Sequence, residues 1–290
     1  MIRQPFTFHR PESVTEAVRL LSELGDDSKV LAGGQSLMPA MNLGVVAPKH
    51  VVSVNGLRST LSYVREEGSE IAIGALTTHH TLATSELLQQ RCLVLAEAAA
   101  DIGDVQVRHR GTIGGSIAHF DPAADYPTVC LVLGAKFRLA GPNGERTVAA
   151  EDFFVDYLTT AIEPQELVTE VRVPVLPLGT GSAYAKHRRI EGGFAIVGAA
   201  AVVELSHGIC QRVSVAVSGG GTIPFRISNI EGRCRGKQMD NDLIAEVAEA
   251  AYNAAQDPTN ELHASADYKR DMVRVFTKRA VRAAVERATK

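Results

Sequence analysis

Hydrophobic positions change their spacing along this chain, and the changes predict alternating helices and strands. Residues 11–24 carry an apolar stripe at helical spacing behind Ser13 and Glu16, which are placed as in a capping box. Short apolar runs at 29–32 and 51–54 and an alternating run at 70–75 predict strands. Later apolar runs predict helices at 81–88, 92–100 and 127–133.

The second half of the chain predicts mostly strands, followed by two long helices. Strands are expected at 136–139, 146–148 and 166–173, with a short helix at 151–157. Prolines and glycines cluster between Pro174 and Gly181, which indicates a domain boundary. Beyond it, runs at 182–190, 195–205 and 210–218 predict an antiparallel meander, and amphipathic helices are expected at 241–255 and 265–289. The pattern predicts an α+β chain with domains 1–176 (subdomains about 1–57 and 58–176) and 177–290.

Two glycine-rich segments carry the most informative chemistry. Residues 29–37 read KVLAGGQSL and residues 111–119 read GTIGGSIAH, so each pairs adjacent glycines with a following serine, Ser36 or Ser116. Glycine lets consecutive backbone N–H groups approach one anion, and hydroxyls donate further hydrogen bonds to phosphate oxygens. Two such loops could grip a diphosphate from both sides, which favours a dinucleotide cofactor. Neither matches the Rossmann or P-loop pattern.

Composition narrows the function further. A net charge of −3 gives no electrostatic argument for binding nucleic acid, and no apolar run reaches membrane-spanning length. The first residues contain no apolar signal-peptide core, which favours a cytoplasmic location. The four cysteines are scattered without any C-x-x-C pair, so we expect free thiols and neither zinc nor an iron–sulfur cluster in this chain.

Three motifs in order make the prediction specific. They are AGGQSLMP at 32–39, GTIGGSIAH at 111–119 running into DPAADYP at 121–127, and YAKHRR at 184–189. Together they resemble the FAD-binding medium subunit of the molybdenum hydroxylases, a family that includes aerobic carbon monoxide, xanthine and N-heterocycle dehydrogenases. The resemblance covers essentially the whole chain. It implies an FAD-binding PCMH-type (vanillyl-alcohol-oxidase-like) domain of two subdomains, followed by a C-terminal α+β domain of the carbon monoxide dehydrogenase flavoprotein type, with an antiparallel sheet and helices.

The resemblance also implies a set of FAD-binding residues. Asp125, expected in a rigid turn rather than a helix, matches an acidic contact near the adenosine half, and Lys186 matches a lysine near the flavin. Ile102 and Val168 match apolar positions against the cofactor, the latter on the adenine side. The two loops supply the rest: Val30, Leu31, Ala32, Gly33, Gly34, Gln35, Ser36, Leu37, Gly111, Thr112, Ile113, Gly114, Gly115 and Ser116.

By the same resemblance, the chain is an electron-transfer subunit without catalytic or metal-binding residues of its own. A large subunit would hold molybdopterin and hydroxylate the substrate, and a small subunit would hold two [2Fe–2S] clusters that reduce this FAD. The sequence does not identify the substrate or the final acceptor, for which a quinone, NAD or a cytochrome are all open. A dimer of heterotrimers is expected.

Several alternatives remain open. The chain could be a stand-alone oxidase or dehydrogenase of the vanillyl-alcohol-oxidase type, or a binding module that has lost FAD. His119 could face the flavin, and His79 or His80 could attach it covalently. Residues 186–189 could form a basic patch for a partner. The surface beside the flavin edge has four candidate residues near the second glycine segment: Ile117, Ala118, Phe120 and Pro122.

Overall fold

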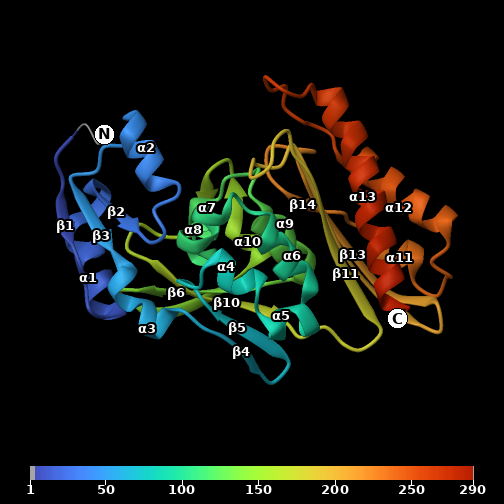
Figure 1. Ribbon diagram of the computed structural model, residues 1–290, viewed down its shortest axis with the longest axis horizontal. Helices are drawn as coiled ribbons and strands as arrows, with labels where there is room; N and C mark the ends of the chain where they lie inside the picture. The colour runs from blue at the N-terminus through green and yellow to red at the C-terminus, as the bar shows by residue number, and fades with distance from the viewer. Residues whose placement is uncertain (1–3, 290) are drawn as a thin grey trace.

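The computed structural model describes residues 4–289, which form three units that follow one another along the molecule (Figure 1). Each unit is built on one sheet, with strand orders β1-β3-β2, β4-β5-β10-β6-β7 and β11-β12-β13-β14. Strands β8 and β9 form a separate small hairpin. The architecture is mixed helix and sheet, as the sequence predicts.

The N-terminal unit is a parallel sheet in which β3 lies between β1 and β2. Helix α1 begins after Ser13, whose hydroxyl accepts a hydrogen bond from the Glu16 N–H at 3.1 Å, so the capping prediction is confirmed. Because the strands are parallel, their carboxyl ends meet at one edge of the sheet, where ligands commonly bind. The elements are β1 (Thr7–His9), α1 (Val14–Leu24), η1 (Gly25–Asp27), β2 (Ser28–Leu31), α2 (Leu37–Leu43), β3 (His50–Ser53), η2 (Val54–Leu57) and α3 (Arg58–Leu61).

The middle unit packs helices on one face of an antiparallel sheet, visible as the cyan to yellow-green elements at the centre of Figure 1. Its core is apolar and includes a cluster of phenylalanine rings at Phe120, Phe137, Phe153 and Phe154. The elements are β4 (Val64–Glu67), β5 (Glu70–Gly74), α4 (His79–Ala83), α5 (Glu86–Arg91), α6 (Leu93–Asp101), α7 (Val105–Arg110), α8 (Ile113–His119), α9 (Asp125–Leu133), β6 (Lys136–Gly141), β7 (Gly144–Ala149), α10 (Ala150–Phe153), β8 (Phe154–Asp156), β9 (Thr159–Thr160) and β10 (Leu167–Pro174).

The C-terminal unit is the predicted antiparallel meander with its two long helices. Alternate residues of β12 belong to different cores: Ala200 and Val202 join the core of the middle unit, whereas Ala201 and Val203 join that of the C-terminal unit. A sheet buried on both faces explains the unbroken apolar run of this strand. The elements are β11 (Thr180–His187), β12 (Val197–Ser206), β13 (Ile209–Ser218), β14 (Phe225–Arg226), α11 (Ile230–Cys234), α12 (Asn241–Ala254) and α13 (Ala266–Ala288).

Some local predictions were wrong. The expected helix at 81–88 is two helices, because Ser85 caps a new helix by accepting a hydrogen bond from Leu88 N–H. The expected helix at 151–157 ends at Phe153 and continues as β8. Asp125 is the first residue of α9 and not part of a turn outside a helix. Helices α2 and α8 were not predicted, since glycine and proline obscure their apolar spacing.

Candidate cofactor site

The two glycine segments, far apart in sequence, lie against each other. A Cβ atom added to Gly33 would stand 2.3 Å from the Arg110 carbonyl oxygen and 2.7 Å from the Gly111 Cα, closer than atoms can approach. A Cβ on Gly115 would lie 3.7 Å from that of Ala32. Glycine is therefore needed at position 33 so that the two backbones can meet. This contact joins the carboxyl end of β2 to the start of α8.

The first segment, residues 32–37, offers a run of free backbone donors. Gly34 takes a left-handed φ of +78°, and Ser36 is the residue before α2. The following N–H groups donate no hydrogen bond to any residue between 4 and 289: Gly33, Gly34, Gln35, Ser36 and Leu37. Consecutive unpaired N–H groups around a left-handed glycine are the arrangement that binds phosphate oxygens. We call residues 32–37 the donor loop.

The second segment, residues 111–116, instead uses most of its donors within the chain. Of its six backbone N–H groups, only that of Thr112 lacks an acceptor among the described residues. The other five bond as follows: Gly111 to Val107 O (2.7 Å), Ile113 to Thr77 O (3.1 Å), Gly114 to Ala75 O (2.9 Å), Gly115 to Thr112 Oγ1 (3.2 Å) and Ser116 to Thr112 O (3.0 Å). We call residues 111–116 the anchored segment, because it is fixed to the middle unit through its own backbone.

The prediction that both glycine segments cradle a diphosphate with their backbones therefore needs revision. Gly114 does not face an open cradle: a Cβ there would lie 2.5 Å from the Ala75 Cβ and 2.8 Å from its carbonyl oxygen. This glycine serves close packing. The anchored segment still has one free side-chain donor, since the Ser116 hydroxyl is half-buried and bonded to no described residue. The Ser36 hydroxyl of the donor loop is equally free.

Asn55 braces the donor loop, and nothing in the sequence pattern pointed to it. Its Nδ2 donates to the Ala32 carbonyl at 2.9 Å and to Ser53 Oγ at 3.2 Å. It can do so because β2 and β3 are parallel, with Leu31 paired to Ser53, so the segments that follow both strands emerge side by side. Only the parallel register, which the sequence does not reveal, brings Asn55 to this loop.

His79 contacts the start of the anchored segment. Its backbone N–H donates to the Gly111 carbonyl at 3.1 Å, and its Nδ1 lies 2.9 Å from the Tyr126 hydroxyl. The ring is buried, and burial, aided by the charge of Arg108, lowers the pKa of His79 to about 4. His79 is thus a neutral structural residue. His80 is exposed and stacks on His109 with ring centroids 4.0 Å apart.

Asp125 and Lys186 form a buried ion pair between the middle and C-terminal units. Lys186 Nζ lies 2.9 Å from Asp125 Oδ1 and donates to the Asp101 carbonyl at 3.1 Å, while the Tyr184 hydroxyl donates to Asp125 Oδ1 at 2.6 Å. Both charged side chains are at most 4% exposed. The adenosine and flavin ends of an extended FAD lie on opposite sides of its diphosphate. The two residues therefore cannot serve opposite ends of such a cofactor.

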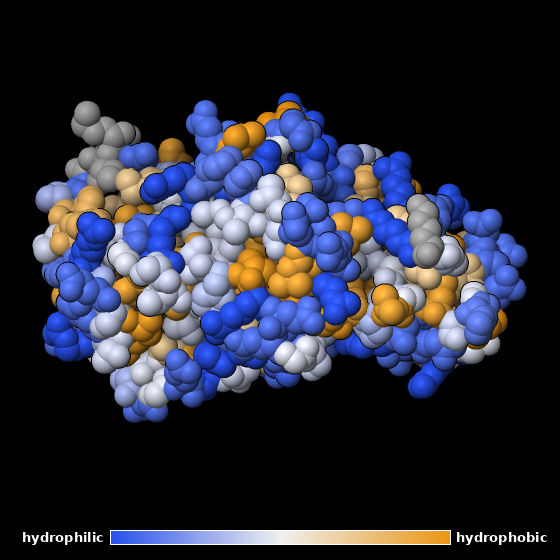
Figure 2. Space-filling model, turned by 60° about the horizontal axis from the view of Figure 1, so that its bottom comes forward, coloured by the Kyte–Doolittle hydropathy of each residue, from blue (hydrophilic) through white to orange (hydrophobic). Residues whose placement is uncertain are grey.

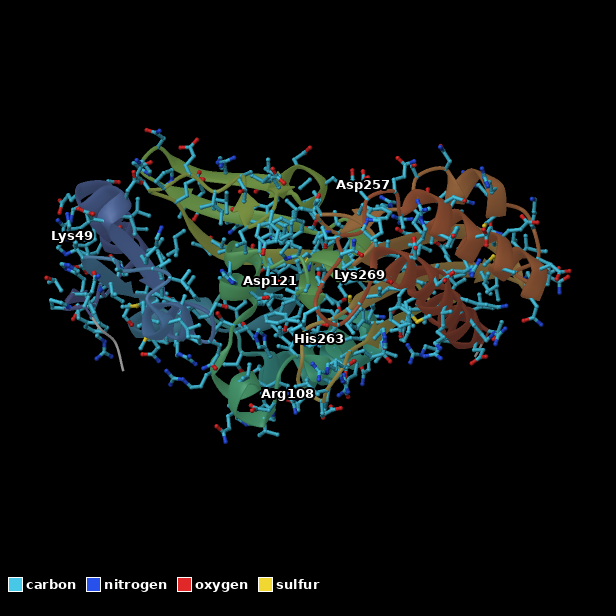
Figure 3. The ribbon with its side chains drawn as sticks, turned by 90° about the horizontal axis from the view of Figure 1, so that it is seen from above. Lys49, Arg108, Asp121, Asp257, His263 and Lys269 are labelled. Atoms are coloured by element: carbon cyan, nitrogen blue, oxygen red, sulfur yellow. The ribbon has the colours of Figure 1, made fainter. Side chains whose placement is uncertain are left out.

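The other predicted positions fall into two places. Ile102 follows Asp101 directly, at the end of α6, so it lies beside the ion pair. It is held there by Arg108, whose guanidinium donates to the Ile102 and Gly103 carbonyls at 3.1 and 2.8 Å. Val168 is buried on β10 in the core of the middle unit. Figure 3 labels Arg108 on the helix that projects from the middle part of the molecule.

The residues considered for the flavin edge differ in how far they are buried. Ile117 and Phe120 are fully buried and pack internally. Ala118 and His119 are exposed, and Pro122 is half-buried. Apolar side chains on the face shown in Figure 2 gather in several small patches and not in one continuous surface.

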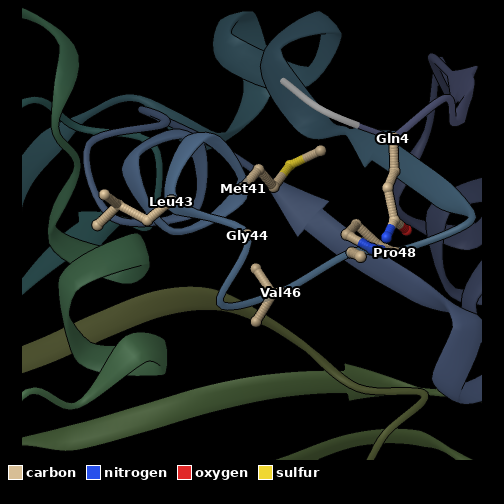
Figure 4. Close-up of a pocket in the computed structure, with 7 residues that line it drawn as sticks. Gln4, Met41, Leu43, Gly44, Val46 and Pro48 are labelled. Atoms are coloured by element: carbon tan, nitrogen blue, oxygen red, sulfur yellow. The ribbon is translucent and has the colours of Figure 1, made fainter. Parts of the chain in front are cut away.

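A hollow in the N-terminal unit lies apart from the donor loop. A cavity of about 200 Å³ lies beyond the carboxyl end of α2, lined by residues that include Met41, Leu43 and Val46 (Figure 4). It is smaller than the 300–1,000 Å³ typical of small-molecule sites, and the donor loop does not line it. No group of three or more metal-ligating side chains occurs among residues 4–289, and no helix there is long and apolar enough to cross a membrane.

Comparisons with known proteins identify the family of this chain. The description of the FAD binding domain in molybdopterin dehydrogenase matches residues 4–176, and that of the CO dehydrogenase flavoprotein C-terminal domain matches residues 182–284. The chain is 42% identical to the carbon monoxide dehydrogenase medium chain of Hydrogenophaga pseudoflava, over 98% of both chains. It is 39% identical to subunit alpha of the 6-hydroxypseudooxynicotine dehydrogenase complex of Paenarthrobacter nicotinovorans, over 98% of this chain and 95% of that one.

A solved structure has the same fold. The carbon monoxide dehydrogenase of Hydrogenophaga pseudoflava that lacks the Mo-pyranopterin moiety superposes with a TM-score of 0.95, covering 99% of each chain. The chain therefore belongs to the family of FAD-binding medium subunits of the molybdenum hydroxylases, of the carbon monoxide and xanthine dehydrogenase type. The family prediction is confirmed, and the comparisons give the stand-alone oxidase no support.

Proposed function

We propose that this chain binds one FAD noncovalently and acts as the electron-transfer subunit of a heterotrimeric molybdenum hydroxylase. The observation that carries the proposal is the run of five unpaired N–H groups in the donor loop, pressed against the anchored segment. Such a run suits the two negative charges of a diphosphate, which need several donors at one place. The family to which the chain belongs identifies the dinucleotide as FAD.

The residues divide the task between binding and support. The donor-loop N–H groups and the hydroxyls of Ser36 and Ser116 would take the diphosphate oxygens. Asn55 holds the donor loop by its Ala32 carbonyl, and Thr112 holds the start of α8 by accepting from Gly115. When bound, FAD supplies the redox chemistry, because it can accept electrons from one partner and pass them on to another. The proposal also keeps Ile102, Asp125, Val168 and Lys186 as cofactor-binding residues, with Asp125 and Lys186 serving the same part of FAD because they form one ion pair.

The partners follow from the names of the relatives, which are medium chains and complex subunits. We place substrate hydroxylation on a large molybdopterin subunit, and electron delivery on a small subunit with [2Fe–2S] clusters. An external acceptor would reoxidise the flavin. We further propose a dimer of heterotrimers, a cytoplasmic location, which the four buried free cysteines favour, and a domain boundary at 176/177.

Purification of the chain with and without its partners tests the proposal. The protein should show a flavin absorbance spectrum, and acid precipitation should release FAD into the supernatant. Alone, it should not oxidise organic substrates and should show at most weak diaphorase activity with artificial dyes. A colourless protein that binds no added FAD, or flavin that stays on the acid pellet, would contradict noncovalent FAD binding. Rapid turnover of an organic substrate by the chain alone would favour the oxidase.

A further inference from the structure

Arg58 has an unusual environment next to the donor loop. It is the first residue of α3, and its Nε donates to Asn55 Oδ1 at 3.2 Å. Its Nη2 is buried and finds no hydrogen-bond partner among residues 4–289, nor does any carboxylate there form an ion pair with it. Buried guanidinium groups are normally paired. A buried donor without a partner loses the hydrogen bond that it makes to water in the unfolded chain and gains none in return, which costs free energy.

A second cation lies close to Arg58. Arg110 also forms no ion pair with any described carboxylate, and its backbone carbonyl faces Gly33 across the contact between the two glycine segments. Burial and the charge of Arg110 both lower the pKa of Arg58, although the guanidinium stays charged at neutral pH. Arg58 therefore brings a cation without a carboxylate partner next to Asn55, which bonds the donor loop, and the charge of Arg110 acts on the same guanidinium.

The connection from Arg58 to the loop is short and continuous. Arg58 donates to Asn55, and Asn55 donates to the Ala32 carbonyl at the start of the donor loop. Each bond restricts the next side chain, so Arg58 fixes the rotamer of Asn55 and Asn55 fixes the loop. We propose that Arg58 is a positioning residue for the diphosphate: it orders the donor loop through Asn55 and supplies positive charge that the bound diphosphate neutralises.

This inference rests on the proposed function, since it assumes that a diphosphate binds at the donor loop. The test uses the full chain, stripped of flavin, with FAD affinity measured by calorimetry and by flavin fluorescence. The variants are Arg58→Met, which keeps length without charge, and Arg58→Lys, which keeps the charge. Arg212→Met is the matched control, because Arg212 is an exposed, unpaired arginine on β13 of the C-terminal unit.

We expect Arg58→Met to weaken FAD binding by about ten- to a hundredfold, the range for removing one nearby charge at a partly buried site. Arg58→Lys should weaken FAD binding by less than about a third as much as Arg58→Met does, measured as binding free energy. Arg212→Met should bind FAD as the wild type does. ADP, which carries the diphosphate without the flavin, should lose affinity for Arg58→Met by a similar factor. Affinity in Arg58→Met should also depend less steeply on salt.

A purely structural role for Arg58 makes different predictions. It would lower the melting temperature of the flavin-free Arg58→Met variant, whereas we expect no decrease, because the substitution also removes a buried orphan donor and a repulsion. Wild-type FAD affinity in Arg58→Met, or an ADP affinity that does not change, would overturn the inference while leaving the proposed function intact. Failure of the wild-type chain to bind FAD would overturn both.

Discussion

The donor loop leaves its backbone N–H groups free, whereas the anchored segment bonds nearly all of its own to the middle unit. Both segments contain Gly-Gly followed by serine, yet they have different surroundings. The donor loop follows β2, an edge strand of a small parallel sheet, and no described residue accepts its N–H groups. The anchored segment runs through the middle of a larger unit, where Thr77 and Ala75 accept its N–H groups. Similar glycine motifs can therefore provide a binding loop in one place and a packing contact in another.

The largest expected effect comes from a side chain at either packed glycine. Gly33→Val would force the two segments apart at Arg110, and Gly114→Val would collide with Ala75. Both should abolish measurable FAD binding, and the cause is protein packing and not collision with the phosphate. Gly114→Val should also lower the melting temperature, since overpacking typically costs about 1–3 kcal/mol of unfolding free energy.

The matched control is Gly232→Val, because a Cβ at Gly232 meets no atom within 4 Å. It should leave FAD affinity and the melting temperature near wild type. A Gly114→Val protein with wild-type stability that fails to bind FAD would instead place Gly114 in an open cradle for the phosphate.

The buried ion pair of Asp125 and Lys186, between the middle and C-terminal units, should give the next largest effect. Asp125→Asn and Lys186→Met each leave one buried partner uncompensated, which typically costs about 3–5 kcal/mol of unfolding free energy. The double variant should lose much less than the sum, and chemical denaturation of all four proteins measures the coupling. Additive losses would mean that the two side chains do not depend on each other.

Acid should lower the stability of the protein by protonating His79, which contacts the anchored segment and not the donor loop. Its folded pKa of about 4 lies below the unfolded value near 6.5, so the unfolded chain binds a proton that the folded chain does not. Stability is therefore complete above about pH 6.5 and falls as pH drops toward 4, by roughly 3 kcal/mol. The His79→Gln variant should show less of this loss between pH 6.5 and 4 in denaturation curves, and an unchanged acid profile would exclude His79 as its source.

The smallest effects should come from the two serines, and they should differ. Ser116→Ala removes the side-chain donor that the anchored segment has free, whereas Ser36→Ala leaves the N–H groups of the donor loop in place. We expect FAD affinity to fall about tenfold for Ser116→Ala and about threefold for Ser36→Ala, within the range for one hydrogen bond. Titration of flavin-free protein measures both, and a larger loss in Ser36→Ala would reverse the comparison.

The sequence predicted the family, the glycine motifs and most elements, because these depend on local spacing. It correctly predicted the capped helix after Ser13 and the antiparallel meander of the C-terminal unit. It could not predict which glycine segment has free donors, since that depends on where Thr77 and Ala75 lie in the fold. Short-range patterns also missed α8, whose glycines give no helical signal.

Long-range contacts explain the remaining differences. The sequence singled out Asp125 and Lys186 separately, for opposite ends of FAD, and did not predict that they form an ion pair. Their contact depends on β11 of the C-terminal unit lying beside the middle unit. Asn55 and Arg58 carried no motif at all, because they reach the donor loop only through the parallel pairing of β2 and β3. Such residues become visible when unpaired donors and uncompensated charges are traced in the structure.

Amide hydrogen exchange of the flavin-free chain, with and without added FAD, tests most directly whether the donor loop holds the diphosphate. Exchange should slow strongly at residues 33–37, whose N–H groups are unpaired before FAD binds. At residues 113–116 it should change little, because those N–H groups are already hydrogen-bonded within the chain. Protection gained mainly at 113–116, with residues 33–37 unchanged, would contradict the assignment of the diphosphate to the donor loop.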